Sequence, residues 1–328
     1  MKAGTKAKLG RTVLDVTELS FGTAPLGNLF EAVTDEVAEA ALEVAWNSGV
    51  RFFDTAPLYG HGLSEKRLGR FLRGKPRDSY TLASKVGRLL RADVPPEPRQ
   101  SFVNTPPVNP VFDFSYDATM RSLEESLERL GLDRIDLLHI HDPDDHFKEA
   151  LNGSYRALDE LRSEGVIGAV GAGMNQWQML ARLAREGDFD CFLLAGRYTL
   201  LDQSAFANLM QLAADRGIAI IAAGVFNSGV LADPKPNARF NYQQAPPELI
   251  EKARRIAAVC ARHGVPLKTA AVQFPIAHPA VPTVLIGSRS AAQVAENARG
   301  FEAPIPGQLW EELKVEGLLA PEVPTPTS

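Results

Sequence analysis

The sequence has few cysteines and no long hydrophobic run. Only Cys191 and Cys260 occur among 328 residues, which excludes a disulfide framework and favours a reducing compartment. The longest apolar run, residues 218–226, has about half the length of a membrane span. The N-terminal segment MKAGTKAKLG is charged and lacks the apolar core of a signal peptide. We therefore expect a soluble, cytoplasmic protein with no membrane partner.

Excess positive charge is also missing. The chain has 35 Lys and Arg against 40 Asp and Glu, a net charge of −5, and no block of like charge. This balance argues against a nucleic-acid partner. With 45% hydrophobic and 23% charged residues, the composition is that of an ordinary globular protein, so a disordered or fibrous chain is excluded.

A repeating unit runs along the chain, in which an amphipathic helix ends in glycine and an apolar strand follows. Helices are predicted over 34–48, 116–130, 154–164 and 204–216, each closed by a glycine that can adopt the left-handed conformation. The strands are apolar on both faces, which is typical of a buried parallel sheet. They are predicted over 19–26, 51–55, 80–86, 135–141, 167–173, 191–196, 218–224 and 282–286.

Eight such strands with helices between them predict an α/β fold, a single (β/α)8 TIM barrel that spans residues 1–328 as one domain. The alternative is an open doubly wound sheet, but the segment LSFGTAPLG after the first strand is not the glycine-rich dinucleotide turn of that fold. Three segments fall outside the repeat: an N-terminal β-hairpin within 1–17 that plugs one barrel end, a long proline-rich mouth loop over 88–114, and a flexible tail over 319–328.

Three of the predicted strands carry a polar residue at or near their C-terminal end. Asp54, Lys85 and His141 each stand where the chain leaves the barrel, the end at which barrel enzymes carry their chemistry. Lys85 needs a charged partner if it is buried, and Asp54 is the natural one. Tyr59 follows in the next loop, where an ammonium group would lower its pKa and make it a proton shuttle. The alternative is a structural ion pair at the barrel rim.

The segments FFDTAPLYG, SEKRLGRFL, LASKVG and IDLLHIHDPD together resemble the signature segments of the aldo-keto reductases. The resemblance extends over nearly the whole chain, to VLIGSRSAAQVAENARGF. It implies a barrel that binds a nicotinamide cofactor without a Rossmann domain. Within the family, FVNTPPVNPVFDF and LLAGRYTLLDQ are most similar to the branch of D-threo-aldose (L-fucose) 1-dehydrogenases and pyridoxal 4-dehydrogenases.

The resemblance implies a catalytic tetrad of Asp54, Tyr59, Lys85 and His141. Tyr59 would exchange a proton with the reacting oxygen, Lys85 would lower its pKa, Asp54 would hold Lys85, and His141 would orient the substrate oxygen. His139 faces the same way as His141 but lies one layer deeper, so we interpret it as a core histidine.

The resemblance also implies the cofactor site. Gly22, Thr23 and Asn175 would lie on the nicotinamide side, although GAGMN departs from the usual pattern around that asparagine. Ala223 stands where a stacking tyrosine is usual, and Phe226 is the candidate to replace it. Pyrophosphate contacts through the loop backbone are expected from Asn227, Ser228, Gly229 and Leu231. Contacts to the adenosine phosphate side are expected from Gly287, Ser288, Arg289, Gln293 and Asn297. Because Gly287 and Gln293 stand where many relatives have cations, NAD is favoured, while Arg289 leaves NADP open.

The expected substrate is a small molecule, a sugar or a pyridoxal-like compound, and Trp177, Arg197 and Phe102 are expected to border its site. No metal is expected at Asp142, Asp144, Asp145 and His146. The function predicted is oxidation of the C1 hydroxyl of an aldose to a lactone by hydride transfer. Alternatives are pyridoxal 4-dehydrogenase, a general aldehyde or ketone reductase, a cofactor-sensing subunit without catalysis, and a lyase that forms a Schiff base on Lys85. The oligomeric state is not predicted.

Overall fold

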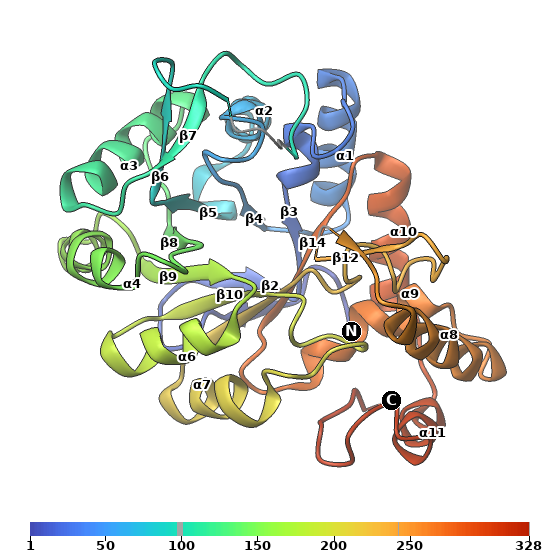
Figure 1. Cartoon of the computed structure of the whole chain (residues 1–328). Helices are drawn as coiled ribbons and strands as arrows, with labels where there is room; N and C mark the ends of the chain where they lie inside the picture. The colour runs from blue at the N-terminus through green and yellow to red at the C-terminus, as the bar shows by residue number, and fades with distance from the viewer. Residues whose placement is uncertain (97–100, 242, 328) are drawn as a thin grey trace.

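The computed structural model describes residues 1–96, 101–241 and 243–327, and its centre is a closed barrel of eight parallel strands (Figure 1). The strands follow one another around the barrel in chain order, which confirms the predicted fold class. They are β3 (Leu19–Gly22), β4 (Phe52–Asp54), β5 (Thr81–Val86), β8 (Leu137–His141), β9 (Ala169–Met174), β10 (Cys191–Ala195), β11 (Ala219–Ala223) and β14 (Thr283–Gly287).

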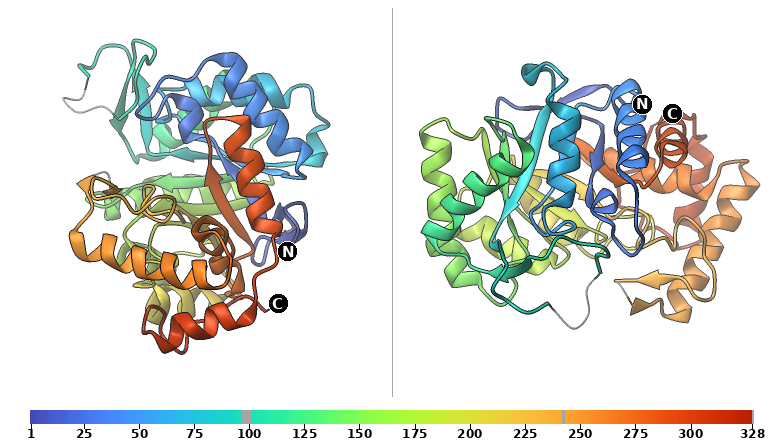
Figure 2. Two further views of the ribbon diagram at one scale, coloured as in Figure 1. Left: turned by 90° about the vertical axis from the view of Figure 1, so that its right-hand side faces the viewer. Right: turned by 90° about the horizontal axis from the view of Figure 1, so that it is seen from above.

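A layer of helices surrounds the barrel, as Figure 2 shows from two further sides. The α3 helix shows why they form: the Ser115 hydroxyl accepts the Ala118 N–H at its start, and Gly131 closes its end with φ 62°. The helices are α1 (Asp35–Asn47), α2 (Leu63–Leu72), α3 (Tyr116–Leu130), α4 (Phe147–Glu149), α5 (Arg156–Ser163), α6 (Trp177–Glu186), α7 (Gln211–Arg216), α8 (Pro247–Arg262), α9 (Leu267–Gln273), α10 (Ala291–Glu302) and α11 (Gly307–Val315).

Short 3₁₀ or π turns extend or connect these elements. One π turn, η3, joins α4 to α5, so the helical segment predicted over 154–164 begins earlier, at Phe147. A second, η4, leads directly into α7 within the segment predicted over 204–216. The turns are η1 (Ala24–Gly27), η2 (Arg77–Ser79), η3 (Ala150–Tyr155), η4 (Phe206–Met210) and η5 (Phe274–Ala277).

The N-terminal hairpin closes the end of the barrel at which the strands begin. Its strands, β1 (Lys6–Lys8) and β2 (Asp15–Thr17), pair antiparallel. Leu9 and Val16 are fully buried in one apolar cluster with Phe52 and Leu137 from the barrel interior. The hairpin therefore acts as the predicted plug.

Two of the segments outside the repeat are more ordered than the sequence suggests. In the 88–114 loop, β6 (Arg88–Arg91) and β7 (Asn109–Phe112) form an antiparallel hairpin, because the branched and aromatic side chains at its ends suit strand pairing; residues 97–100 lie outside the described part. In the 319–328 segment, expected to be loose, Leu319 and Val323 are buried in the core, and Ser328 is not described. A third small hairpin joins β12 (Arg239–Phe240) to β13 (Gln243–Gln244).

The packing of α2 on α3 depends on Gly69. A side chain at this position would overlap the Leu130 carbonyl oxygen. We predict that Gly69→Ala lowers the free energy of unfolding by about 1–3 kcal/mol, since overpacking outweighs the better helix propensity of alanine. Chemical denaturation measures it. Gly74→Ala is the control, because its nearest neighbour atom would be 3.7 Å away; equal stability of both variants would contradict the packing argument.

His139 lies in the barrel interior, fully buried, with no hydrogen-bond partner for either ring nitrogen among the described residues. Burial, aided by the Lys85 charge, lowers its pKa well below 6.5. Below pH 6.5 the unfolded chain therefore binds a proton that the folded chain does not, and stability falls as the pH falls. We predict that His139→Leu removes up to about 2 kcal/mol of the loss in unfolding free energy between pH 7 and pH 5. If the unfolding free energy of His139→Leu and of the unmodified protein fell equally between pH 7 and pH 5, this prediction would be wrong.

Candidate active site

The strand ends bring Asp54, Lys85 and His141 together at the open end of the barrel. The Lys85 Nζ donates to Asp54 Oδ1 at 2.6 Å, to Oδ2 at 2.8 Å and to the Thr55 carbonyl at 2.9 Å. Both side chains of the pair are at most 2% exposed. A buried ammonium group with three oxygen acceptors is fully satisfied, so Lys85 is held as a cation at a fixed position.

Tyr59 completes this group from the loop between β4 and α2. Its ring centroid lies 4.7 Å from Lys85 Nζ and 5.8 Å from the His141 ring, which it meets edge-on. The loop is seated on η1 by close backbone contact: a Cβ on Gly27 would lie 2.6 Å from the Tyr59 carbonyl carbon. The four residues of the predicted tetrad are therefore neighbours, from β4, β5, β8 and one loop.

A buried hydrogen-bond network joins the segments on both sides of Asp54 and supports the loop that carries Tyr59. The Thr23 hydroxyl donates to the Asp54 carbonyl at 2.9 Å, and the Ser64 hydroxyl contacts Thr23 at 2.6 Å and Thr55 at 3.0 Å. All of these groups are buried. The network orients the chain on both sides of Asp54, so Thr23 has a positioning role here rather than a place in a cavity wall.

An inner cavity of about 270 Å³ opens over this group. Tyr59, Lys85 and His141 line it, together with Phe102 and Asn175, whose amide donates to the Ala195 carbonyl at 3.0 Å. Two other predicted residues lie near its edge: Gly22 ends β3 beside β14, and Asp54 is buried against Lys85. His139 is enclosed one layer deeper, as predicted, and His141 is the histidine that reaches the cavity.

Burial controls the electrostatics of the inner cavity. It raises the pKa of Asp54, an effect that the Lys85 charge opposes. Burial also lowers the pKa of His141 well below 6.5, and the positive charges of Arg88 and Lys85 add to this. His141 is therefore a neutral imidazole near pH 7, which can donate one hydrogen bond without bringing a second positive charge to the site.

A side cavity of about 470 Å³ adjoins the inner cavity, since Ala24 and Leu29 line both. It runs along the ends of β11 and β14 to the start of α10. Eight of the predicted cofactor residues line it: Phe226, Ser228, Gly229, Gly287, Ser288, Arg289, Gln293 and Asn297.

The start of α10 is built for polar contacts. The Asn297 amide donates to the Ser288 hydroxyl at 3.0 Å, and the Arg289 N–H donates to Gln293 Oε1 at 2.8 Å. The Ser290 hydroxyl caps the helix by accepting the Gln293 N–H. A 12-residue helix that points its N-terminus into a cavity suits the phosphates of a dinucleotide, so the side cavity fits a nicotinamide cofactor.

Asn227 and Leu231 do not line the side cavity. Leu231 is fully buried in the core, and the Asn227 side chain accepts from the Thr199 hydroxyl at 2.6 Å and donates to the Gly196 carbonyl at 3.1 Å. Both residues shape the loop after β11 from its inner side. Their side chains point into the protein, so any contact that these two residues make with pyrophosphate would come from the loop backbone, as the sequence predicts.

Three charged residues of the side cavity were missed by sequence reasoning. They are Arg239, Lys268 and Glu296. Lys268 Nζ lies 3.0 Å from both carboxylate oxygens of Glu296, and Arg239 comes from β12, which is bridged to Gly229. Glu296 lies within the segment GSRSAAQVAEN, so the resemblance offered a signal for it, whereas nothing in the local sequence marks Arg239 or Lys268, which only the folded chain brings beside the end of β14.

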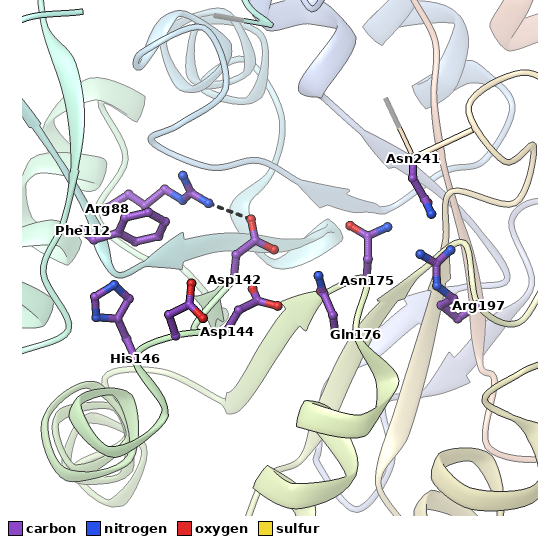
Figure 3. Close-up of a pocket in the computed structure, with 10 residues that line it drawn as sticks. Arg88, Phe112, Asp142, Asp144, His146, Asn175, Gln176, Arg197 and Asn241 are labelled. Carbon is purple, nitrogen blue, oxygen red and sulfur yellow. Dashed lines mark hydrogen bonds and ion pairs between the residues drawn. The ribbon is translucent and has the colours of Figure 1, made fainter. Parts of the chain in front are cut away.

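An outer pocket of about 650 Å³ opens beside the inner cavity (Figure 3). Its lining is polar except for one aromatic ring and includes Arg88, Phe112, Asp142, Asp144, Asp145, His146, Asn175, Gln176, Arg197 and Asn241. Of the predicted substrate residues, Arg197 lies here and Phe102 lies in the inner cavity. Trp177 lines neither; it begins α6 and packs against the hydrophobic core. Among the described residues, no cluster of His, Cys, Asp or Glu could hold a metal ion, and no helix is long and apolar enough to cross a membrane.

Comparison with known proteins agrees with this geometry. The profile of the Aldo/keto reductase family matches residues 18–315. The chain is 44% identical to pyridoxal 4-dehydrogenase of Microbacterium luteolum, over 98% of this chain and 99% of that protein. It is 45% identical to D-threo-aldose 1-dehydrogenase of a Pseudomonas species, over 95% and 96%.

A solved structure extends the comparison. The holo form of an aldo-keto reductase from Bacillus halodurans superimposes with a TM-score of 0.72 at 25% identity, covering 97% of each chain. The resemblance noted in the sequence is thus confirmed over nearly its full length. The chain belongs to the aldo/keto reductase family and is an NAD(P)-dependent oxidoreductase that acts on CH–OH or aldehyde groups.

Proposed function

We propose that this protein oxidises the C1 hydroxyl of an aldose to a lactone, with NAD as the hydride acceptor. The observation that carries the proposal is the inner cavity, where Tyr59, Lys85 and His141 face one space that opens into a polar outer pocket. The similarity to a D-threo-aldose 1-dehydrogenase supports the substrate class.

In this proposal Tyr59 accepts the proton of the anomeric hydroxyl while C1 loses a hydride. The positive charge of Lys85, fixed by Asp54, favours the phenolate and so assists the proton transfer. The neutral His141 imidazole donates a hydrogen bond to the reacting oxygen and orients it. A nicotinamide cofactor held by the residues of the side cavity would supply the hydride acceptor, so that one CH–OH group becomes one C=O group.

The charges of the side cavity support NAD. Arg289 is already engaged, since it donates to the Leu29 carbonyl at 2.9 Å and lies 3.6 Å from Glu31. Glu296 neutralises Lys268 and adds a carboxylate to the cavity, a group that suits a ribose hydroxyl better than a 2′-phosphate. Arg239, which also lines the side cavity, favours NADP instead, because a guanidinium group binds the 2′-phosphate well.

Pyridoxal is the second candidate substrate, because Phe102 stands beside Tyr59 with 6.1 Å between ring centroids. This aromatic wall suits a pyridine ring. A Schiff-base lyase is disfavoured, since Lys85 Nζ is buried and already engaged by three oxygen acceptors of Asp54 and Thr55.

A substrate panel tests the proposal. We predict turnover of L-fucose, D-arabinose or L-galactose with NAD, at a kcat/KM at least about tenfold higher than with NADP or with pyridoxal, since the polar pocket matches hydroxyl groups. The absorbance of the reduced nicotinamide measures it in both directions. Preference for pyridoxal would select the second candidate, and preference for NADP would refute the cofactor assignment.

Tyr59→Phe tests the proton transfer. We predict that kcat falls by about 100-fold or more, because the proton acceptor is lost while the ring is kept. The Kd for NAD, measured by fluorescence titration, should stay unchanged. Tyr116→Phe is the matched control, since Tyr116 lies on α3 outside the cavities described. Substantial kcat in Tyr59→Phe would remove this residue from the mechanism.

A further inference from the structure

The outer pocket is joined to the inner cavity by two residues, Asp142 and Asn175, which line both. A substrate whose reacting carbon lies beside Tyr59 therefore extends past these side chains into the outer pocket. Figure 3 shows Asp142 between Arg88 and Asn175, with a dashed line to the Arg88 guanidinium. The residues at this junction are therefore placed to contact the part of the substrate next to its reacting group.

The Asp142 carboxylate is held rigidly at the junction. Its backbone has a left-handed φ of 47°, and its N–H donates to the Gly173 carbonyl at 3.1 Å. Its Oδ2 accepts from the Arg88 guanidinium at 2.8 Å and lies 3.6 Å from His141 Nε2. Arg88 is fixed in turn, since its guanidinium carbon stands 4.2 Å above the Phe112 ring centroid.

The second carboxylate oxygen of Asp142, Oδ1, is the one available to a ligand. Oδ1 has no hydrogen-bond partner among the described residues, whereas Oδ2 is occupied by Arg88. A carboxylate oxygen only accepts hydrogen bonds, so its natural partner in a ligand is a hydroxyl or amine group. Because the other oxygen of the same carboxylate, Oδ2, lies 3.6 Å from His141 Nε2, this partner would belong to a ligand group near the reacting oxygen.

The rest of the outer pocket matches a hydroxylated ligand. Asn175, Gln176 and Asn241 present amides, which both donate and accept, and Phe112 adds one aromatic face. Sugar hydroxyl groups also both donate and accept. A few polar side chains beside an aromatic ring make a suitable site for such a molecule.

The charge of the outer pocket disfavours anions. Its two arginines are both paired, Arg88 with Asp142 at 2.8 Å and Arg197 with Asp202 at 3.7 Å. Asp144 and Asp145 form no ion pair within the described ranges and leave the pocket negative. A phosphorylated or carboxylated sugar would meet like charge there.

We propose that Asp142 is the specificity-determining residue of this enzyme, and that it selects uncharged polyhydroxy substrates by accepting a hydrogen bond from the hydroxyl next to the reacting carbon. The remaining hydroxyl groups bind in the outer pocket. This inference rests on the proposed function, because it assigns the hydroxyl groups of the aldose to particular side chains.

The test compares two three-carbon aldehydes in the reductive direction. Glyceraldehyde carries a hydroxyl next to its carbonyl, and propanal does not. Asp142→Asn is the variant, because asparagine tolerates the left-handed backbone and keeps the shape of the side chain while removing its charge. We expect kcat/KM for glyceraldehyde to fall by about 10- to 100-fold, mainly through KM, and at least tenfold more than kcat/KM for propanal.

Other outcomes of this experiment overturn the inference. An equal fall for both aldehydes would mean that Asp142 acts through His141, and no fall for either would mean that it does not contact substrate. Asp133→Asn, an exposed acid before β8 at the other end of the barrel, is the control and should behave like the unmodified protein. Because the comparison needs no aldose oxidation, failure of the proposed function shows separately, as reduction of aldehydes without oxidation of any aldose.

A second measurement tests the charge of the pocket. We expect the unmodified enzyme to prefer glyceraldehyde to its 3-phosphate, and the Asp144→Asn, Asp145→Asn double variant to reduce that preference about fivefold or more. An unchanged preference would remove the acidic residues from substrate selection.

Discussion

The buried ion pair between Asp54 and Lys85 is the interaction on which the rest of the site depends. Two charges enclosed in a protein are stable only if their geometry is close to ideal and their remaining hydrogen-bonding groups are satisfied. Here both carboxylate oxygens and the Thr55 carbonyl surround one ammonium group. That arrangement requires β4 and β5 to be neighbours in a register that pairs Asp54 with Ala83. The closed barrel supplies both conditions.

Around this pair the molecule arranges three connected spaces. The inner cavity contains the reactive side chains, the side cavity continues from it past Ala24 and Leu29, and the outer pocket continues past Asp142 and Asn175. The side cavity ends at a helix N-terminus, which suits phosphate groups, whereas the outer pocket ends among carboxylates, which repel them. The side cavity and the outer pocket therefore differ in the ligand chemistry that they accept.

The barrel could be predicted from the periodicity of the sequence, whereas the grouping of Asp54, Tyr59, Lys85 and His141 was predicted from strand ends together with the resemblance to a family. Strand alternation places Asp54, Lys85 and His141 at corresponding strand ends, and a family motif carries Tyr59. Loop residues were less predictable, since a motif gives the position of a side chain in the sequence but not its direction. Trp177 stands at the expected helix start, yet it packs against the core and lines neither the inner cavity nor the outer pocket.

Residues that approach a site from distant segments could not be predicted at all. Arg239 reaches the side cavity from a small hairpin, and Arg88 acts through a carboxylate that the sequence suggested only as a doubtful metal ligand. In both cases the position depends on how loops pack over the open end of the barrel. No local pattern of residues encodes that packing.

The N-terminal hairpin has a consequence for the response of the enzyme to salt. With Leu9 and Val16 sealing the lower end of the barrel, dissolved ions approach the interior only from the open end. Charges that solvent ions cannot approach are screened little by them. The charges of the Asp54–Lys85 pair, at most 2% exposed, should therefore be screened little in concentrated or dilute buffer, whereas the more exposed charges that line the side cavity and the outer pocket should respond to ionic strength.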